Sequence, residues 1–310
     1  MPEGERLKSA ENTYLTGELA RLRRVMAEDG IIEVLVTRCD SASMDLTAQV
    51  GPFCGVIPRN EAVLCADSED VRDIAIITRV GKAAAVKILS IERTDDGEVL
   101  LILSRRAAQQ ACREEYISRL RPGDIIPAVV THMECFGAFL DIGCGIVSLM
   151  TIDSISVSRI SHPRERFRCG EKISCVVKSI DRESGRIYMS CRELLGTWEE
   201  NVAEFRAGQT VTGIVRSIES YGIFVELTPN LAGLAECRDG VEVGDVCAVY
   251  IKSIIPDRMK IKLVLIDSAK ADYEPSLKYR LSRSVTPHIS HWRYSPAECT
   301  RVIESVFDEI

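Results

Sequence analysis

The feature that most constrains the fold of this chain is a repeated aromatic pair at the start of a short apolar stretch. FGAF occupies Phe136 to Phe139, and YGIF follows at Tyr221 to Phe224. The flanking residues align almost without gaps, from GDIIPAVVTH to GRIYMS in one copy and from GQTVTGIVRS to MKIKLV in the other. Each copy holds five stretches with the period-two alternation of β-strands. The repeat therefore predicts two similar five-stranded domains.

A third, more divergent unit precedes these two. IIEVLVTRCD from Ile31, SMDLTAQVG from Ser43 and FCGVIPRNEA from Phe53 alternate like strands, and AAAVKILSIER from Ala83 and EVLLILSRRA from Glu98 supply two more. Five short strands with a connector between the third and the fourth describe a Greek-key barrel of the OB type. We therefore expect an all-β chain of three tandem five-stranded OB-fold barrels joined by helical connectors.

The domain boundaries are expected to follow these repeats. The connectors have the length and charge of semi-rigid helices, which would hold the barrels as a string of beads with limited bending. The expected segments are an N-terminal helical segment at 1–30, barrels at 31–106, 121–192 and 208–267, connectors at 107–120 and 193–207, and a C-terminal tail at 268–310.

Both ends of the chain carry further structure signals. Leu15, Leu19, Leu22 and Met26 have the spacing of one amphipathic helix over residues 11–29. In the tail, HWRYSP is expected to dock on a barrel or connector, because its Trp and Tyr are costly to leave in water. The final CTRVIESVFDEI is expected to form a short helix.

Composition limits the function classes. The net charge of −7 argues against a protein that simply coats polyanions, since non-specific phosphate binding depends on clustered Lys and Arg. The repeats are nearly neutral, with ten basic and nine acidic residues in 120–195 and seven and eight in 206–268. No apolar stretch approaches the roughly 20 residues of a spanning helix, and the first residues lack the apolar core of a secretory signal. We therefore expect a cytoplasmic protein without membrane contact.

Metal and catalytic constellations are missing from the sequence. The 12 cysteines are scattered singly, and most, such as Cys175 and Cys247, fall in strand patterns typical of buried free thiols in a reducing compartment. HISH at His288 to His291 has no further ligand cluster except Cys299, so we expect no metal site. No Walker loop, nucleophile elbow or nuclease carboxylate cluster occurs. We expect no catalytic residues, no cofactor and no enzyme activity.

The second and third units resemble a known family. GDIIPAVVTHMECFGAFLDIGCGIVSLM, followed by SRISHPRERFRCGEKISCVVKSIDRESGRIYMS, is similar to the S1 RNA-binding domain. The stretch from Ser158 through Leu234 is similar to the junction between repeats of bacterial small-subunit ribosomal protein S1. The resemblance is strong over residues 120–268 and weaker over 31–106. It implies a single-stranded RNA-binding protein that helps messenger RNA engage the small ribosomal subunit.

The resemblance also implies an aromatic contact surface. In such barrels two aromatic residues of the second strand stack on unpaired bases, here Phe136 with Phe139 and Tyr221 with Phe224. Residues three apart would face opposite sides of a flat strand, and Gly137 permits a bulge or bend that brings both rings to one surface. The alternative is that these rings fill the barrels.

Polar family positions map onto the remaining site residues. Asp181 and Arg186 stand where the family contacts nucleic acid, although the two could simply pair across their turn. Ser148 and Glu236 replace the family's histidine after strand three. The resemblance thus implies an RNA-binding set of Phe136, Phe139, Ser148, Asp181, Arg186, Tyr221, Phe224 and Lys260.

The third unit departs further from the family than the second. Pro256 takes the acidic position and Lys260 the basic one, and the Glu236 carboxylate would repel a phosphodiester. Arg216 and Lys252 are further basic residues of that unit. We therefore expect the second unit to dominate binding. In its connector loop, Arg164, Arg166 and Arg168 are available for phosphates, unless the loop is simply solvated.

The first unit has MDLTAQ in its second strand and hence no stacking platform. Its family analogues are docking domains, so protein contacts through the first barrel are one expectation, and a spacer without a partner is the other. For the whole chain, the alternative to RNA binding is a ribosome- or RNA-processing-associated adaptor that uses its OB barrels for protein contacts.

Overall fold

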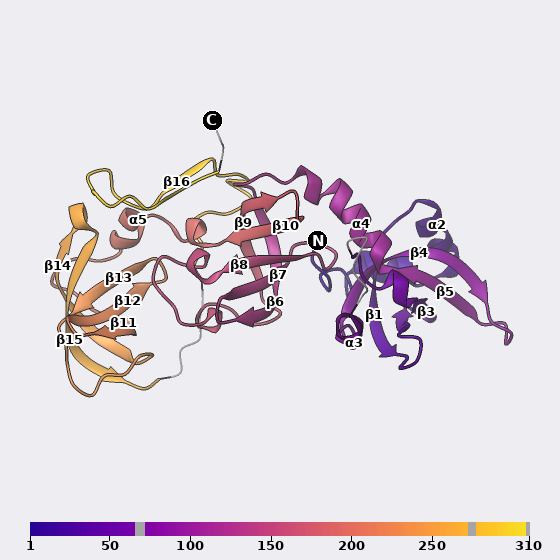
Figure 1. The fold of residues 1–310 in the computed structure, drawn as a ribbon, viewed down its shortest axis with the longest axis horizontal. Helices are drawn as coiled ribbons and strands as arrows, with labels where there is room; N and C mark the ends of the chain where they lie inside the picture. Colours follow the sequence, from indigo (N-terminus) through magenta and orange to yellow (C-terminus); the bar gives the residue numbers. More distant parts are fainter. Residues whose placement is uncertain (66–71, 272–276, 308–310) are drawn as a thin grey trace. The chain divides into compact units, whose positions relative to one another are not determined.

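The computed structural model describes residues 1–65, 72–271 and 277–307 and contains three closed five-stranded barrels (Figure 1). The expected all-β architecture of tandem OB-type barrels is therefore confirmed. In every barrel the third strand pairs in parallel with the fifth, and this pairing closes the sheet. None of the helices in these described ranges is long and apolar enough to cross a lipid bilayer.

The first barrel has the strand order β1-β2-β3-β5-β4. Its interior is filled by apolar side chains that alternate along the strands, as Leu46, Ala48 and Val50 do in the second strand. The strands are β1 (Ile32–Cys39), β2 (Leu46–Val50), β3 (Phe53–Ile57), β4 (Ala83–Arg93) and β5 (Val99–Ser104).

The second barrel repeats this plan with the order β10-β8-β7-β6-β9. A long connector separates its third and fourth strands and carries two short 3-10 helices, η3 (Ile152–Ser154) and η4 (Pro163–Glu165). The strands are β6 (Ile125–Glu134), β7 (Gly137–Asp141), β8 (Val147–Thr151), β9 (Lys172–Asp181) and β10 (Arg186–Ser190).

The third barrel has the order β11-β12-β13-β15-β14. Alternation is clearest in its last strand, where Ile261, Leu263 and Leu265 point inward and the residues between them are exposed. The strands are β11 (Thr210–Glu219), β12 (Gly222–Thr228), β13 (Leu231–Ala235), β14 (Val246–Ile255) and β15 (Lys260–Ala269), with the 3-10 helix η6 (Pro256–Arg258) in the last hairpin.

The helical segments are shorter than their sequence patterns suggest. The expected N-terminal helix is two helices, α1 (Ala10–Thr16) and α2 (Leu19–Ala27), interrupted at Gly17, which caps the first helix. The first barrel also carries η1 (Arg59–Glu61) and α3 (Asp73–Ile77).

The two connectors differ in form. The first contains a regular helix, α4 (Arg105–Glu115), followed by η2 (Ile117–Arg119). The second is split at Gly196, whose φ of +85° ends η5 (Arg192–Leu195) before α5 (Trp198–Val202) begins. A continuous semi-rigid helix in the second connector is therefore a wrong expectation.

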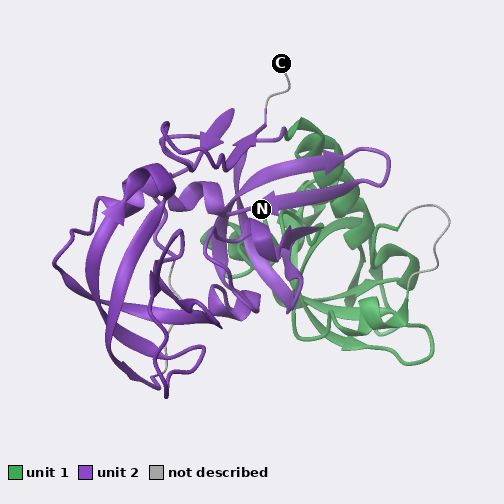
Figure 2. Cartoon of the chain, turned by 60° about the vertical axis from the view of Figure 1, so that its left-hand side comes forward, with its two compact units in different colours: residues 1–120, 141–147 green, residues 121–140, 148–310 purple. Residues whose placement is uncertain are grey.

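The chain divides into two compact units (Figure 2). Unit 1 comprises residues 1–120 and 141–147, and unit 2 comprises residues 121–140 and 148–310. Unit 2 therefore contains the second barrel except residues 141–147, the whole third barrel and the described part of the tail. Most of the second barrel thus lies in one compact unit with the third barrel.

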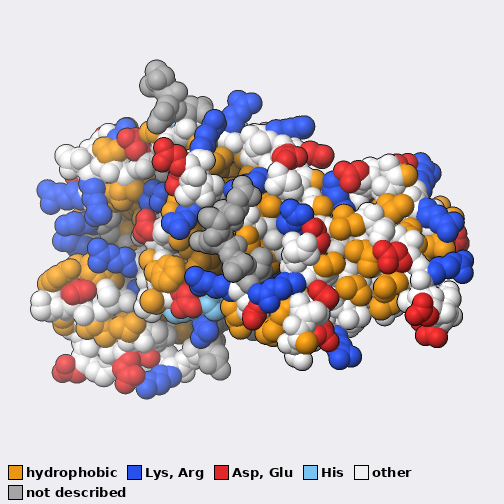
Figure 3. Space-filling view, turned by 45° about the vertical axis from the view of Figure 1, so that its right-hand side comes forward, with side chains coloured by type: hydrophobic (Ala, Val, Ile, Leu, Met, Phe, Trp, Pro, Cys, Tyr) orange, Lys and Arg blue, Asp and Glu red, His pale blue; other side chains and the backbone are white. Residues whose placement is uncertain are grey.

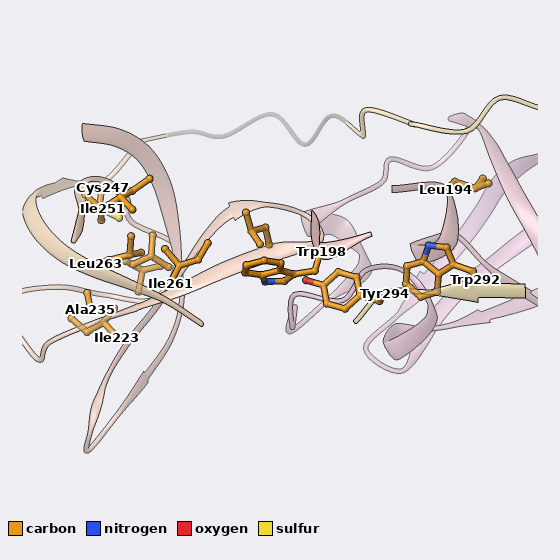
Figure 4. Packing of buried hydrophobic residues seen from close by; sticks show 14 of the residues in the cluster. Leu194, Trp198, Ile223, Ala235, Cys247, Ile251, Ile261, Leu263, Trp292 and Tyr294 are labelled. Atoms are coloured by element: carbon orange, nitrogen blue, oxygen red, sulfur yellow. The ribbon is translucent and has the colours of Figure 1, made fainter. Parts of the chain in front are cut away.

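One apolar cluster runs through unit 2 (Figure 4). Ile125 and Val176 of the second barrel belong to it, as do the interior of the third barrel and Trp198 of the connector. Trp292 and Tyr294 of the tail join the same cluster, with ring centroids 5.8 Å apart. Since burying an aromatic side chain contributes on the order of 2–3 kcal/mol, these residues hold the tail and both barrels as one body.

Buried charges also join the two barrels of unit 2. Arg216 of β11 donates to Glu226 of β12 from Nε at 2.8 Å and from Nη2 at 3.1 Å. Arg166, in the connector of the second barrel, donates to the same carboxylate, and Arg216 also bonds Glu165 of η4. Two arginines thus alternate with two glutamates, which compensates the cost of burying each charge.

The expected docking of the tail is confirmed over the described residues 277–307. The backbone N–H of Ile289 donates to the Gly123 carbonyl, and that of Ile125 donates to the Pro287 carbonyl, each at 2.9 Å. The Tyr294 carbonyl accepts the backbone N–H of Trp198 at 3.0 Å. The expected terminal helix is wrong within this range, because β16 (His291–Arg293) pairs there with β17 (Glu304–Val306); residues 308–310 lie outside the described part.

Candidate nucleic-acid interface

The aromatic pair of the second barrel lies on its outer surface. Phe136 is 51% exposed and Phe139 is half-buried, and their ring centroids are 5.9 Å apart at an interplanar angle of 89°. Neither ring belongs to the buried core, so the alternative that these rings fill the barrel is wrong. The edge-to-face contact fixes the two rings against each other and leaves ring surface facing solvent.

The turn after β6 and the glycine that follows it place the two rings side by side. Phe136 precedes β7 and lies in the turn after β6, while Phe139 lies within β7. Gly137 is needed because a Cβ there would stand 2.3 Å from the Met150 carbonyl oxygen. The missing side chain lets the turn close against β8, and this places Phe136 beside Phe139.

The third barrel repeats the geometry closely. Tyr221 is 67% exposed, Phe224 is half-buried, and their centroids are 6.1 Å apart at 90°. A Cβ on Gly222 would stand 2.6 Å from the Ala235 carbonyl oxygen, so the glycine has the same role. The duplicated sequence motif is therefore a duplicated surface.

Strand register extends each surface across two further strands. In the third barrel Phe224 pairs with Leu234, which pairs with Lys262 of β15. In the second barrel Leu149 of β8 pairs in the same way with Tyr188 of β10. Lys262 is exposed and Tyr188 is partly exposed, and the sequence motifs do not single out either of them.

The basic and acidic residues of the last hairpin take different roles in the second barrel. Asp181 pairs with Arg186 in register, but its carboxylate accepts hydrogen bonds from Ser184 and from the backbone N–H of Glu183 at 3.0 Å. The Ser184 hydroxyl is the main cause that holds the pKa of Asp181 below its usual range. Asp181 thus shapes the turn, and the exposed Arg186 guanidinium is the group that can reach a phosphate.

The equivalent hairpin of the third barrel corrects one sequence assignment. Lys260 is exposed, as expected for a basic contact residue, and it pairs with Ile255. The counterpart of Asp181 is therefore Ile255 and not Pro256, which begins η6. The residue paired with the basic position is thus apolar in this barrel.

Ser148 does not belong to the surface. It is only 3% exposed and its hydroxyl donates to the Leu140 carbonyl 3.4 Å away, so it points into the barrel. The parallel pairing aligns Leu149 and Met150 with Leu234 and Ala235, which makes Thr151 the counterpart of Glu236. An alignment of Ser148 with Glu236, as the sequence motifs suggest, is therefore wrong by three residues. Thr151 is half-buried beside Gly137, and Glu236 is exposed.

Two arginines that the sequence suggests as phosphate contacts form buried ion pairs inside the protein instead. Arg216 and Arg166 are buried in the ion pairs with Glu226 described above. Arg164 and Lys252 remain exposed. Figure 3 shows that Lys and Arg side chains still gather at the left edge of the drawn face, while Asp and Glu are dispersed across it.

The first barrel offers no comparable site in its described residues. In β2, which corresponds to the strand with the aromatic pair in the other barrels, Ala48 is buried and Gln49 is exposed.

The two histidines of HISH in the tail have different partners. His288 lies 2.8 Å from Asp124, and His291 lies 3.0 Å from Glu304. All 12 cysteines are free, and six of them, including Cys175 and Cys247, are buried.

Comparison with known proteins defines the class of the second barrel. Residues 119–192 match the S1 RNA binding domain family, so the barrel that carries Phe136 and Phe139 is similar to the domains of that family. The resemblance found in the sequence is therefore confirmed.

The curated relatives are bacterial small-subunit ribosomal proteins. The chain is 28% identical over 240 residues to the small ribosomal subunit protein bS1 homolog of Bacillus cereus (strain ATCC 10987 / NRS 248), covering 74% of this chain and 60% of that protein. It is 32% identical over 156 residues to bS1 of Staphylococcus aureus (strain COL), covering 49% and 40%. The chain thus spans at most about three fifths of the length of these relatives.

Solved structures resemble this chain only at low TM-scores. A multidomain protein with nucleic acid binding domains from Streptococcus pneumoniae TIGR4 is 13% identical, with 79% of this chain and 76% of that chain covered and a TM-score of 0.24. GSP13 from Bacillus subtilis is 23% identical, with 24% and 57% covered and a TM-score of 0.23.

Proposed function

We propose that this chain is a single-stranded RNA-binding protein of the bS1 type, which helps messenger RNA engage the small ribosomal subunit in translation. The observation that carries the proposal is the exposed edge-to-face pair of Phe136 and Phe139 in the segment that matches the S1 RNA binding domain. Stacking on aromatic side chains contributes ~1–3 kcal/mol per base with little sequence preference. Such a surface suits unpaired RNA of many sequences.

The two RNA-binding barrels divide the work unequally. In the second barrel Phe136 and Phe139 stack on bases, Arg186 contacts a phosphate, and Asp181 holds the hairpin that presents Arg186. In the third barrel Tyr221, Phe224 and Lys260 take the corresponding roles. Its Glu236 carries a negative charge at the edge of the aromatic pair, which opposes a phosphodiester.

The same proposal covers partners and location. The protein acts in the cytoplasm, where it contacts the small ribosomal subunit and messenger RNA without a catalytic role. We propose 121–192 and 208–267 as the boundaries of the two RNA-binding barrels and 31–106 as those of the first barrel, with 1–30, 107–120, 193–207 and 268–310 as the segments around them.

One observation favours protein contacts through the first barrel. Its surface exposes the large apolar side chains of Ile74 and Ile77 on α3 and of Leu89 on β4, and it lacks the aromatic pair. Exposed apolar side chains are a common basis of protein contacts. The adaptor function is therefore the second candidate, with the first barrel as its docking domain.

Titration of a fluorescent, unstructured oligoribonucleotide tests the RNA-binding proposal. Phe136→Ala combined with Phe139→Ala should lose ~2–6 kcal/mol of binding free energy, corresponding to two stacked bases. Tyr14→Ala is the matched control, because Tyr14 is an equally exposed aromatic residue on α1 with no role in the proposed surface. The wild-type protein should also prefer single strands over a duplex. Equal affinity of the double variant and the wild type would refute RNA binding by this surface.

Sucrose-gradient fractionation of cell extract separates the two candidate functions. A bS1-type protein should migrate with small subunits and be released by ribonuclease treatment of the bound RNA. Migration with a protein complex that ribonuclease leaves unchanged would favour the adaptor.

A further inference from the structure

A third ring lies against the aromatic pair of the second barrel. The His132 imidazole, on β6, has its centroid 6.0 Å from that of Phe139, and the two rings are nearly parallel at 28°. Phe139 is therefore the middle ring of three, with Phe136 on one side and His132 on the other. The three rings come from a strand, the turn after it and the next strand, so the hairpin itself brings them together.

The packing of the protein does not account for a ring at this place. The side chain of His132 is 62% exposed, and its Nε2 atom lies 2.6 Å from Oε1 of Glu134, whose side chain is 49% exposed. Even an ion pair of two such exposed side chains contributes only roughly 0–1 kcal/mol, and a hydrogen bond to this carboxylate is no stronger a constraint on the fold. The pairing with Glu134 thus orients the imidazole but gives little stability, which leaves the ring free to serve as a contact surface.

The third barrel provides the matched comparison. Ser217 of β11 pairs with Phe224 in register, four residues before Tyr221, just as His132 stands four residues before Phe136. The aromatic pairs of the two barrels have nearly the same geometry. The two surfaces therefore differ at this position by one side chain, an imidazole against a hydroxymethyl group.

We propose that His132 is a further RNA-contacting residue, which stacks on an unpaired base next to those held by Phe139 and Phe136. Histidine belongs with Phe, Tyr and Trp among the side chains on which splayed-out bases of RNA stack. The inference rests on the proposed RNA-binding function and deepens it. It gives the second barrel one more base contact than the third, which adds to the inequality between the two barrels.

Two substitutions in the full-length chain test the role of the ring. His132→Ser copies the third barrel and should weaken binding of fluorescein-labelled oligouridylate about five- to tenfold, the lower part of the range for one stacked base. His132→Phe keeps a ring but cannot pair with Glu134, and its affinity should stay within about twofold of the wild type. Tryptophan fluorescence of both variants checks folding, since both Trp residues lie in the core of unit 2.

Introducing a histidine at the equivalent position of the third barrel tests whether a ring there strengthens RNA binding. In a background with Phe136→Ala and Phe139→Ala, which leaves binding to the third barrel, Ser217→His should strengthen binding several-fold. Wild-type affinity in His132→Ser, with a loss in the Phe136/Phe139 variant, would overturn the role of His132 while the proposed function stands. Equal weakness of His132→Phe and His132→Ser would overturn stacking as its mechanism. Unchanged affinity in all variants would refute the RNA-binding function as well.

Discussion

The second and third barrels carry the same aromatic pair in different surroundings. Both pairs are held edge to face by a glycine that lets the turn approach the third strand. Around them, however, Thr151 and Tyr188 in the second barrel correspond to Glu236 and Lys262 in the third. The hairpin geometry thus fixes the rings, while the neighbouring positions are free to change how strongly a nucleic acid is held.

The two barrels also differ in how they hold a buried carboxylate, which lies two residues after the second aromatic residue of each pair. Glu226, in the third barrel, is buried between Arg166 and Arg216. Asp141, at the same place in FGAFLD, is buried too but bonds backbone N–H groups of Glu3, Gly143 and Gly145 at 2.7–3.0 Å. Burial of a carboxylate is therefore compensated by charge in one barrel and by amides in the other.

The largest effect is expected from breaking the charge compensation in the third barrel. Glu226→Ala should lower the free energy of unfolding of unit 2 by about 3–5 kcal/mol, because it leaves two buried guanidinium groups without their shared carboxylate. Urea unfolding followed by tryptophan fluorescence measures this, since Trp198 and Trp292 both report on unit 2.

The control for this experiment is an ion pair that is open to solvent. Glu242→Ala removes the partner of Lys270, whose side chains are 67% and 77% exposed, and should change the unfolding free energy by less than ~1 kcal/mol. A loss from Glu226→Ala no larger than that from Glu242→Ala would show that the buried charges do not join the two barrels.

The sequence predicts the exterior of these barrels better than their interior polar contacts. Alternation and the repeated motif are local signals, and they suffice for three barrels and for the placement of Phe136 and Tyr221 on the surface. The roles of Arg166 and Arg216 depend on a carboxylate 60 and 10 residues away, which no local pattern reveals. Loop arginines therefore look available for phosphates until the partner is known.

Register is the second limit of sequence reasoning. The sequence places Ser148 on the surface because it follows GIV, yet three residues separate it from Thr151, the true counterpart of Glu236. A one-residue slip in a strand already turns a side chain from the surface to the core. His132 carries a signal that the sequence does show, an aromatic residue four positions before FGAF, but only the ring geometry makes it part of the surface.

The next effect is expected from the pH dependence of the carboxylate in the second barrel. Burial, with a smaller contribution from the nearby Glu3, raises the pKa of Asp141 to about 6. A raised pKa means that the fold favours the protonated form, so deprotonation costs stability between pH ~4 and ~6 and the cost is constant above that range. Relative to Asp141→Asn, the wild type should lose about 2–3 kcal/mol over this window.

Urea unfolding followed by circular dichroism at pH 4, 5, 6 and 7 measures this difference. Asp141→Asn has no carboxylate that titrates at this position. The free energy of unfolding of the wild type should therefore fall relative to that of the variant as the pH rises to about 6, and the difference should then stay constant. A gap that does not change with pH would show that the hydrogen bonds from Glu3, Gly143 and Gly145 outweigh burial.

A smaller effect is expected from removing the rings of the weaker surface. Tyr221→Ala with Phe224→Ala should cost about 1–2 kcal/mol of RNA binding, less than the corresponding change in the second barrel. Glu236 is exposed, and under the proposed function its carboxylate would repel a phosphate beside these rings, so each ring should contribute less per base. Glu236→Thr, which copies Thr151 of the second barrel, should strengthen RNA binding when it is made in the otherwise wild-type chain. A loss equal to that of the Phe136/Phe139 variant would show that the two surfaces bind equally.

The smallest effect concerns the two basic residues of the last hairpins, and salt dependence is the sensitive measure of it. Arg186 and Lys260 occupy equivalent positions at the start of β10 and β15, and both are exposed. Each Ala variant should reduce the slope of log affinity against log salt by ~0.7, the value for one phosphate contact on a single strand. Arg186→Lys should keep the slope, because it keeps the charge, but should lose affinity if the planar guanidinium also stacks on a base. An unchanged slope in Arg186→Ala together with a changed slope in Lys260→Ala would place the phosphate contact on the third barrel and reverse the expected order of the two surfaces.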